Sequence, residues 1–322
     1  MPALVQLVAQ LPATLSAAVL VVQHFAPDSD GGHLVERLAR HTRLRCCLPT
    51  HGDPLEASTL YLAPPDRHLL VKHQAVLVTK GPRENNYRPA ADALFRSAAV
   101  AYGPAVIGVV LTGMLHDGTA GLEFIKRCGG LTVVQDPQDA EYSSMPETAL
   151  RNVEIDYVVP ISAMGPLLLR LTRQLPAPGS AAIPEDLKTE AAIAERVVGN
   201  TEEVDKIGRL VPLTCPDCGG NLWEVEHGQV LRYRCHTGHS FTGESLLKNS
   251  QHNLEETLWV ALRMMEERKN LLTSMAVRGE SPYAVQQEER IEEMKKHINR
   301  LREFLINGGG GTSGSTVATP AE

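Results

Sequence analysis

Two side chains capable of acid–base chemistry follow apolar runs that have the length of buried strands. His24 comes directly after the run Ala18–Gln23, and Asp117 follows the run Ala105–Leu111 through the loop 112–116. In open α/β sheets the carboxyl ends of parallel strands line the site crevice. A histidine is a natural general base near neutral pH, and a carboxylate fixes its tautomer and stabilises the imidazolium. Singly, such residues are more often a loop residue and a helix cap, so this pattern alone is not decisive.

A second group of residues has the spacing of metal ligands. Cys215 and Cys218 form a Cys-x₂-Cys pair, and Cys235 and His239 follow as Cys-x₃-His. Two thiolates at a tight turn and two further ligands suit a tetrahedral zinc site, and four protein ligands leave no open position for a substrate. We therefore expect a structural zinc ion bound by these four residues. His236 is a competing fourth ligand, and a set of buried reduced cysteines is the alternative reading.

The elements that must position these residues alternate in type along the first half of the chain. Wholly apolar strands between helices predict an α/β fold with a doubly wound, mostly parallel sheet. The predicted helices cover residues 3–11, 33–40, 119–127, 145–151 and 164–174, with a further helix beginning at Pro89, and the predicted strands cover residues 18–23, 60–63, 69–72, 75–79, 105–111, 131–135 and 157–160.

The composition changes after residue 174, where the first domain, 1–174, is predicted to end. The stretch 175–211 begins with Pro, Ala, Gly and Ser and is expected to be a linker. The Cys/His residues fall in a compact unit, 212–243. Apolar residues at helical spacing in 244–307 predict two amphipathic helices, which could pack on that unit or mediate self-association, and 308–322 is expected to be a disordered tail.

Charge and cysteine content exclude several classes of protein. The net charge is -7 and the isoelectric point is about 6.0, so no basic field attracts nucleic acid or an anionic membrane. No run approaches the roughly 18 apolar residues of a membrane span. The six cysteines form no evenly spaced disulfide framework. These features favour a protein of the reducing cytoplasm.

Four segments resemble, in the same order, the methylesterase domain of the chemotaxis protein CheB. They are VVQHFAPD at 21–28, YRPAADALF at 87–95, LTGMLHDG at 111–118 and QDPQDAEYSSMPETA at 135–149. The resemblance covers about the first half of the chain. It implies a Rossmann-like hydrolase that needs no cofactor for catalysis and removes methyl groups from γ-glutamyl esters of methylated chemoreceptors. Some members of the family also deamidate receptor glutamines.

The resemblance also assigns roles to individual residues. His24 matches the base of a Ser–His–Asp mechanism, and Asp117 matches the acid that orients it. Met114 matches a residue whose backbone lies near the presumed oxyanion site. Leu115 stands where the family usually has glycine, which puts the geometry of this loop in question. The Cys/His unit is similar to zinc-ribbon-like tails of some CheB-related proteins.

The family's nucleophile has no counterpart in this sequence. Its serine lies in a G-x-S-x-G-G turn after the first strand, a central strand, and the present sequence begins at the helix that follows. We expect the missing strand to leave a slot with unpaired backbone groups on its two neighbours. Residues 1–4, MPAL, fit the V-x-x-L continuation of the turn if Met1 is a valine codon read as an initiator, so we expect the gene to begin upstream. The phosphorylation-controlled receiver domain of CheB is likewise not found.

Three classes of function are compatible with these observations. The first is a protein-glutamate methylesterase whose serine segment precedes the given sequence. The second is a non-catalytic, CheB-like signalling protein that binds receptor helices or another signalling protein. The third is a zinc-ribbon interaction module that carries a vestigial domain. The family resemblance favours the first.

Overall fold

The computed structural model describes residues 2–24, 29, 31–72, 74–176, 179, 182–196, 200–277 and 284–306. The chain divides into two compact units, Met1–Leu247 and Lys248–Glu322, and each is described by itself. The predicted disordered tail, 308–322, lies outside the described residues.

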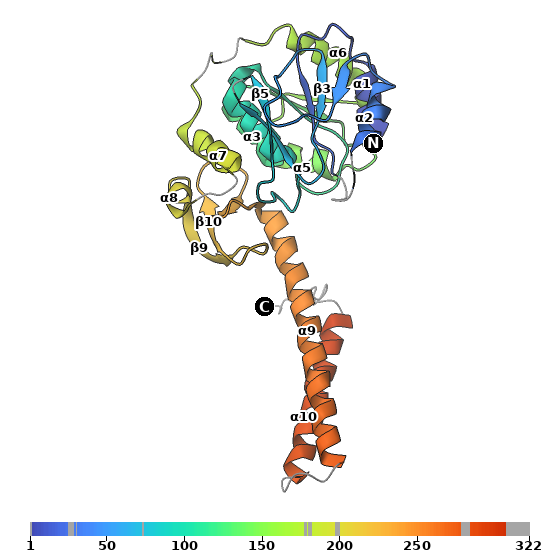
Figure 1. The fold of residues 1–322 in the computed structure, drawn as a ribbon, viewed down its shortest axis with the longest axis vertical. Coiled ribbons are helices and arrows are strands. Elements are labelled where there is room, and N and C mark those ends of the chain that lie inside the picture. The colour runs from blue at the N-terminus through green and yellow to red at the C-terminus, as the bar shows by residue number, and fades with distance from the viewer. Residues whose placement is uncertain are drawn as a thin grey trace, which may run out of the picture. The chain divides into compact units, whose positions relative to one another are not determined.

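Helices and strands alternate through the first part of the first unit, as the sequence predicts (Figure 1). The helices are α1 (Pro2–Ala9), α2 (Gly32–Ala39), α3 (Ala91–Tyr102), α4 (Thr119–Arg127), α5 (Ser144–Asn152) and α6 (Ile161–Thr172), with a 3₁₀ turn at Gly103–Ala105. The strands are β1 (Val19–Val21), β2 (Arg45–Cys47), β3 (Thr59–Leu62), β4 (His68–Lys72), β5 (Ala75–Thr79), β6 (Ile107–Val110), β7 (Leu131–Gln135) and β8 (Tyr157–Val159). This is an α/β fold with parallel strands.

The parallel strands form two separate three-stranded sheets rather than the single sheet that the sequence predicts. Their orders are β1-β3-β2 and β6-β7-β8, and all pairs in both are parallel. Strands β4 and β5, predicted at 69–72 and 75–79, pair antiparallel and form a sheet of their own. Within the described part of the chain, β1 and β6 are edge strands. Between them lies a cavity of about 750 Å³ that both strands line.

Helices cover both faces of the parallel strands. Side chains of β3 alternate between the two faces: Leu60 and Leu62 pack in a cluster with residues of α1 and α2, whereas Tyr61 and Ala63 pack in a cluster with Leu94 of α3. The same division holds for the second sheet, where α1 and α6 pack on one face and α4 on the other. Alternation of this kind follows from the two-residue period of a strand.

The stretch 175–211, expected to be a linker, contains regular structure. Helix α7 (Glu185–Arg196) packs on α3, and α8 (Thr201–Val204) precedes β9 (Gly208–Thr214). Leu187 and Ile193 of α7 are buried. The prediction was wrong because the Pro/Ala/Gly/Ser composition ends at residue 184, and the mixed charges beyond it include a glutamate that is buried in an ion pair instead of solvated.

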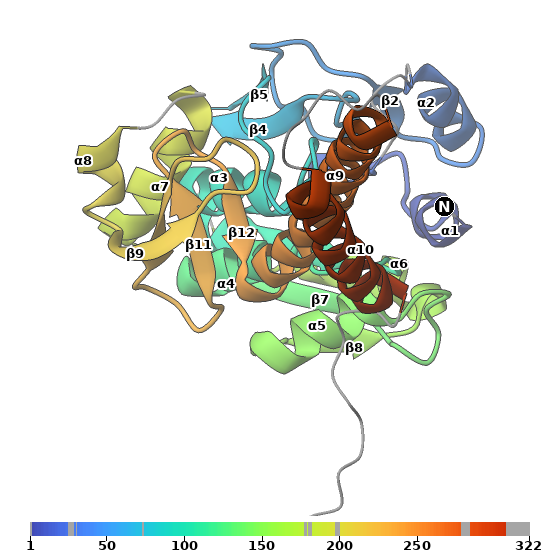
Figure 2. The same ribbon diagram turned by 90° about the horizontal axis from the view of Figure 1, so that it is seen from below.

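A four-stranded antiparallel sheet carries the Cys/His residues. It consists of β9, β10 (Asn221–Val225), β11 (Arg232–Cys235) and β12 (Ser240–Thr242), in the order β12-β11-β10-β9. β10 and β11 are antiparallel neighbours and form a hairpin. Figure 2 shows this sheet beside α3, α4 and α7. We call residues 208–242 the Cys/His module.

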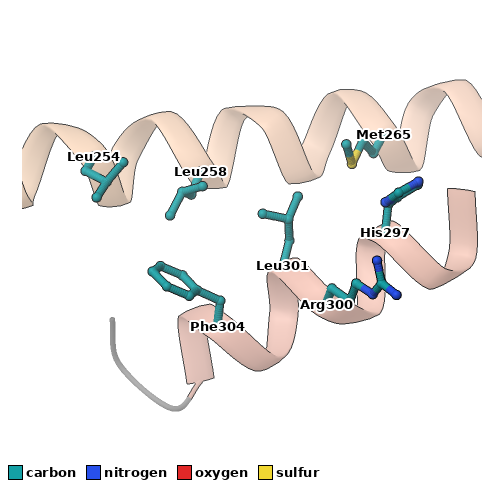
Figure 3. A pocket seen from close by; sticks show the side chains of 7 residues that line it. All are labelled: Leu254, Leu258, Met265, His297, Arg300, Leu301 and Phe304. Carbon is teal, nitrogen blue, oxygen red and sulfur yellow. The ribbon is translucent and has the colours of Figure 1, made fainter. Parts of the chain in front are cut away.

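The second unit is built from two long helices, α9 (Gly243–Val277, whose first residues belong to the first unit) and α10 (Ala284–Ile306). Leu262 and Ile298 are buried between them, and Arg302 forms an ion pair with Glu266 at 2.6 Å. A groove of about 500 Å³ between the helices is lined mainly by apolar side chains (Figure 3). Among the described helices, none has a stretch apolar and long enough to span a membrane.

Candidate active site and metal site

The structure brings His24 and Asp117 together, although they lie 93 residues apart in the chain. The His24 Nε2–H donates to Asp117 Oδ2 at 2.8 Å. The His24 side chain is 26% exposed whereas that of Asp117 is fully buried, so a ligand can reach the imidazole but not the carboxylate. With Nε2 engaged, Nδ1 is the ring nitrogen that can accept a proton from a ligand or a nucleophile.

Asp117 is held by the first turn of α3. The backbone N–H groups of Ala91 and Asp92 donate to Asp117 Oδ2 and Oδ1 at 2.6 and 3.1 Å. Together with His24, three donors surround this carboxylate. The amino end of a helix stabilises negative charge through its unpaired N–H groups and its dipole. Asp117 is therefore positioned to orient the imidazole and to stabilise its protonated form.

Tyr87 packs flat against His24. The two rings are stacked with their centroids 3.8 Å apart and an angle of 3° between their planes. Burial, and to a lesser degree the charge of Asp117, raise the pKa of the Tyr87 hydroxyl. The stack packs against one face of the imidazole, whereas the hydrogen bond to Asp117 is made by a nitrogen at the edge of the ring. Together the two contacts fix the orientation of the ring. Tyr87 was not singled out as a site residue from the sequence, because nothing local to YRPAADALF indicates that its ring meets residue 24.

A second buried carboxylate, Asp92, lies beside Asp117. Its Oδ2 accepts from Asn85 Nδ2 at 2.7 Å, and its Oδ1 accepts from the Gly121 N–H at 2.6 Å. Burial and then the neighbouring charge of Asp117 raise the pKa of Asp92 well above its ordinary value. Because two carboxylates this close do not readily ionise together, the charge of Asp117 adds to the effect of burial on the pKa of Asp92.

The large cavity between β1 and β6 opens at this pair of residues. His24, Tyr87 and Asp117 line it at the carboxyl ends of the two strands, together with Gly113 and Met114. Most of the remaining wall is apolar and comes from α1, α3 and the two strands. Within the residues that the structure describes, no hydroxyl or thiol is hydrogen-bonded to the His24 ring. The described residues thus supply an imidazole–carboxylate pair without a hydroxyl or thiol bonded to it.

The loop before Asp117 is tightly folded against the start of α5. Gly113 accepts from the Met145 N–H, and a Cβ on Gly113 would lie 2.2 Å from the Met145 sulfur, so a larger residue there would require the Met145 side chain to move. Leu115 has a φ of 73°, in the left-handed region that favours glycine. Met114 is exposed and lies at the cavity rim, where its backbone could serve the predicted oxyanion role.

The four predicted metal ligands gather in the Cys/His module. One ligand atom of each of Cys215, Cys218, Cys235 and His239 lies within 4.8 Å of all the others. Cys235 Sγ is 3.8 Å from Cys218 Sγ and 3.5 Å from His239 Nδ1. A hydrogen bond from Cys215 is the main reason that the pKa of the Cys235 thiol is lowered to about 3. Three sulfurs and one imidazole nitrogen at this spacing fit the donor set of a tetrahedral zinc site.

His239, rather than His236, belongs to this cluster in the described part of the chain. Its Nδ1 faces the sulfurs, and its Nε2 lies 3.7 Å from Asp217 Oδ2, an arrangement that orients metal-binding histidines in proteins. The His236 ring instead meets the edge of Trp223, with centroids 6.4 Å apart. His236 thus packs against the sheet.

The fold and the imidazole–carboxylate pair define an α/β domain of hydrolase type. The CheB methylesterase family model matches residues 1–168, and the chain belongs to the CheB methylesterase family. The structure is similar to that of the CheB methylesterase catalytic domain of Thermotoga maritima, with a TM-score of 0.51 and 31% identity, covering 53% of this chain and 92% of that one.

Relatives of this chain carry names of the same family. "Protein-glutamate methylesterase/protein-glutamine glutaminase 2" of Methanosarcina mazei is 36% identical over 179 residues, which make up 53% of this chain and 48% of the relative. A relative from Leptospira interrogans is 36% identical over 164 residues, or 50% of this chain and 83% of its own length. The chain therefore spans about half the length of the Methanosarcina mazei relative. The residues that the family model matches, 1–168, end before the Cys/His module.

Proposed function

We propose that His24 and Asp117 form the catalytic base and its orienting acid in a hydrolase that removes methyl groups from γ-glutamyl esters of chemoreceptor-like proteins, and that also converts receptor glutamine to glutamate. The 2.8 Å hydrogen bond between the two side chains, at the open end of a cavity, carries this proposal. The names of the relatives supply the class of substrate.

The chemistry follows from the positions of these groups. His24 Nδ1 takes the proton of a nucleophilic hydroxyl while the hydroxyl oxygen attacks the ester carbonyl. The imidazolium then returns that proton to the departing methoxide, so methanol leaves and an acyl-enzyme remains. Water, deprotonated by the same imidazole, hydrolyses the acyl-enzyme to the free glutamate and restores the hydroxyl. Asp117, anchored on α3, stabilises the imidazolium in both steps.

The nucleophile comes, in this proposal, from a segment preceding residue 1 that fills the cavity as a strand between β1 and β6. Three observations support it. Within the described residues both strands are edge strands, both line the cavity, and the cavity wall is largely apolar, as the sides of a central parallel strand require. A strand parallel to both neighbours would end beside His24, and the chain would continue directly into α1, which also lines the cavity.

A comparison of two gene products tests the proposed nucleophile. One is the 322-residue chain, and the other extends upstream in frame to the first strand-like segment that ends in G-x-S-x-G. A fluorophosphonate probe should label the serine of the longer product alone, and only that product should release methanol from methylated receptor. His24→Ala in the longer product should abolish both. Absence of such a motif upstream, or a folded longer product that resists the probe, contradicts the proposal and favours a non-catalytic, receptor-binding protein.

The Cys/His module binds zinc in a structural role in this proposal. When bound, the ion would join Cys215, Cys218, Cys235 and His239 and so hold the turns at the end of the four-stranded sheet together. No substrate position remains open on such an ion. Metal analysis of protein purified without chelator should find about one equivalent of zinc, and less than about half an equivalent contradicts the assignment.

The two helices of the second unit are proposed to mediate self-association. Apolar side chains of Val260, Met264, Leu271 and Met275 are exposed on α9, at spacings of four, seven and four residues that place them on one face. Light scattering of the full chain and of a Met264→Glu, Leu271→Glu variant distinguishes a dimer from a monomer. A wild-type chain that is monomeric at high micromolar concentration contradicts self-association.

A further inference from the structure

The strand that follows the metal ligand His239 is bonded to the loop that contacts the catalytic pair. Ser240 of β12 accepts from the Asn85 N–H at 2.8 Å, and its own N–H donates to Arg83 at 3.4 Å. The Thr242 N–H donates to Asn85 Oδ1 at 2.9 Å. Three hydrogen bonds within a few residues therefore clamp the loop 83–87 against the edge of the Cys/His module.

Two short routes lead from this loop to the catalytic pair. Along the first, Asn85 Nδ2 donates to Asp92, and the Asp92 N–H donates to Asp117. Along the second, Tyr87 stacks on the His24 ring. Asn85 is 6% exposed and uses both ends of its amide, with Oδ1 toward the module and Nδ2 toward Asp92. It is the only described side chain that is hydrogen-bonded to both β12 and Asp92.

A buried ion network fastens the module to the same place. Glu84 pairs with Arg96 of α3, Glu190 of α7 pairs with Arg232 at 2.7 Å, and Arg234 lies 3.6 and 3.7 Å from the two glutamates. All five side chains are buried. Such networks tolerate little displacement, because a charge that loses its partner in the interior is strongly destabilising. Movement of β11 or β12 would therefore be transmitted to the loop 83–87 rather than absorbed at the contact.

We infer that metal binding by the Cys/His cluster controls the geometry of the His24–Asp117 pair, with Asn85 as the positioning residue that connects them. The cluster fixes the turn 235–239, from which β12 runs directly to the loop 83–87. Loss of the metal loosens this turn, and Asp117 and the His24 ring then lose their supports from Asn85 and Tyr87. The inference concerns the placement of the pair and holds whether or not the pair hydrolyses esters.

The test follows the catalytic pair by NMR in the 322-residue chain, with zinc and after its removal by a chelator. The first signal is the imidazole of ¹⁵N-histidine-labelled His24, assigned by His24→Gln. The second is amide hydrogen exchange at Ala91 and Asp92, whose N–H groups are bonded to Asp117. Zinc removal should shift the His24 signal and speed exchange at both amides roughly tenfold or more, while amides of β7 stay protected. Restored zinc should reverse both effects.

Substitutions separate the proposed route from general destabilisation. Asn85→Ala should leave the zinc stoichiometry unchanged yet give fast exchange at Ala91 and Asp92 even with zinc bound. If that variant does not fold, Asn85→Asp keeps the acceptor for the Thr242 N–H and removes the donor to Asp92. Asp205→Ala is the matched control, since it removes the acceptor of a single hydrogen bond from Trp223 elsewhere in the module.

Two results would overturn the inference. One is a His24 signal and Ala91 and Asp92 exchange rates that do not respond to zinc in a folded chain. The other is exchange in β7 that speeds as much as at Ala91 and Asp92, which would mean that zinc stabilises the whole unit without directing the catalytic pair. An ester hydrolysis assay is not needed for either result, so failure of the proposed function is distinguishable from failure of this coupling.

Discussion

The proposed catalytic pair and the Cys/His cluster differ in how far apart in the chain their members lie. The four proposed metal ligands fall between residues 215 and 239, and the sheet that holds them is formed from neighbouring segments. His24 and Asp117 are 93 residues apart and meet only because two parallel sheets and the first turn of α3 are assembled around them. Local spacing therefore defines the cluster, whereas the pair depends on the assembly of the whole unit.

The largest effect should come from the pair itself. In a gene product that includes the nucleophile, Asp117→Asn should lower the rate of methanol release by about ten-thousandfold, because an amide neither holds the required tautomer nor stabilises the imidazolium. Asp136→Asn is the control, since Asp136 also follows a parallel strand but lies outside the pair. Equal rates for Asp117→Asn and wild type would remove Asp117 from the mechanism.

In the Cys/His module, loss of one proposed ligand should weaken zinc binding far more than loss of a buried thiol outside the cluster. Cys235→Ser should weaken zinc binding by about a thousandfold or more, because three ligands remain for an ion that prefers four. Cys128→Ser is the control, as Cys128 is buried outside the cluster. Competition with a chromogenic chelator measures the zinc affinity of both variants. Similar zinc affinities for the two variants would leave the cluster without a metal-binding role.

The ion network that joins the two regions should give a pH-dependent stability. Burial alone would raise the pKa of Glu84, but Arg96 and Arg234 overcome it and lower this pKa to about 2. Because the pKa is lower in the folded state, the ionised carboxylate stabilises the fold fully above pH about 4.5, and this stability is lost as the pH falls toward 2. Glu84→Gln should lower the free energy of unfolding by about 3 kcal/mol at pH 7.

Urea unfolding at pH 7, 4.5 and 3 measures the effect of Glu84→Gln, and the difference from wild type should shrink at the lowest pH. Glu56→Gln breaks an exposed ion pair with Arg45 and should change stability little at any of these pH values. A wild-type advantage over Glu84→Gln that stays constant down to pH 3 would show that the charge of Glu84 is not its source.

The smallest expected effect is a gain in stability. Leu115→Gly should raise the free energy of unfolding by about 1 kcal/mol, since a side chain at a φ of 73° is strained and glycine is not. The thermal midpoint should rise by about 2 °C. Met114→Gly, at the preceding position, where φ is not positive, should give no gain in stability. A Leu115→Gly chain that is less stable than wild type would mean that contacts of the leucine side chain outweigh the strain.

Much of the fold could be predicted from the sequence because its elements are strongly patterned. Helix Thr119–Arg127 and strand Leu131–Gln135 have the predicted ends, set by Gly118 before the helix and Gly129–Gly130 after it. Strand β2 was missed because its three residues carry no distinctive pattern. Helix α7 was missed because Glu190, charged and apparently solvated in the sequence, is buried against Arg232 of a distant segment.

The residues that support the proposed catalytic pair, Asn85 and Tyr87, could not be predicted, because their roles also depend on contacts with distant segments of the chain. The metal ligands and the two catalytic residues belong to recognisable local motifs. The role of Asn85 depends on Thr242, 157 residues later, and that of Tyr87 on a ring 63 residues earlier in the chain. Such contacts exist only after the module has packed on the α/β domain. By contrast, the Cys-x₃-His spacing predicts His239 rather than His236 as the fourth member of the cluster, and the structure places the His239 ring there.

The cavity between β1 and β6 affects how the first unit unfolds. Since these two strands are not paired to one another, the two parallel sheets are joined through helices instead of a continuous hydrogen-bond ladder. Each half can then melt in its own transition, and calorimetry of the 322-residue chain should resolve two overlapping heat-absorption peaks. A polypeptide strand seated in the cavity would merge them into one.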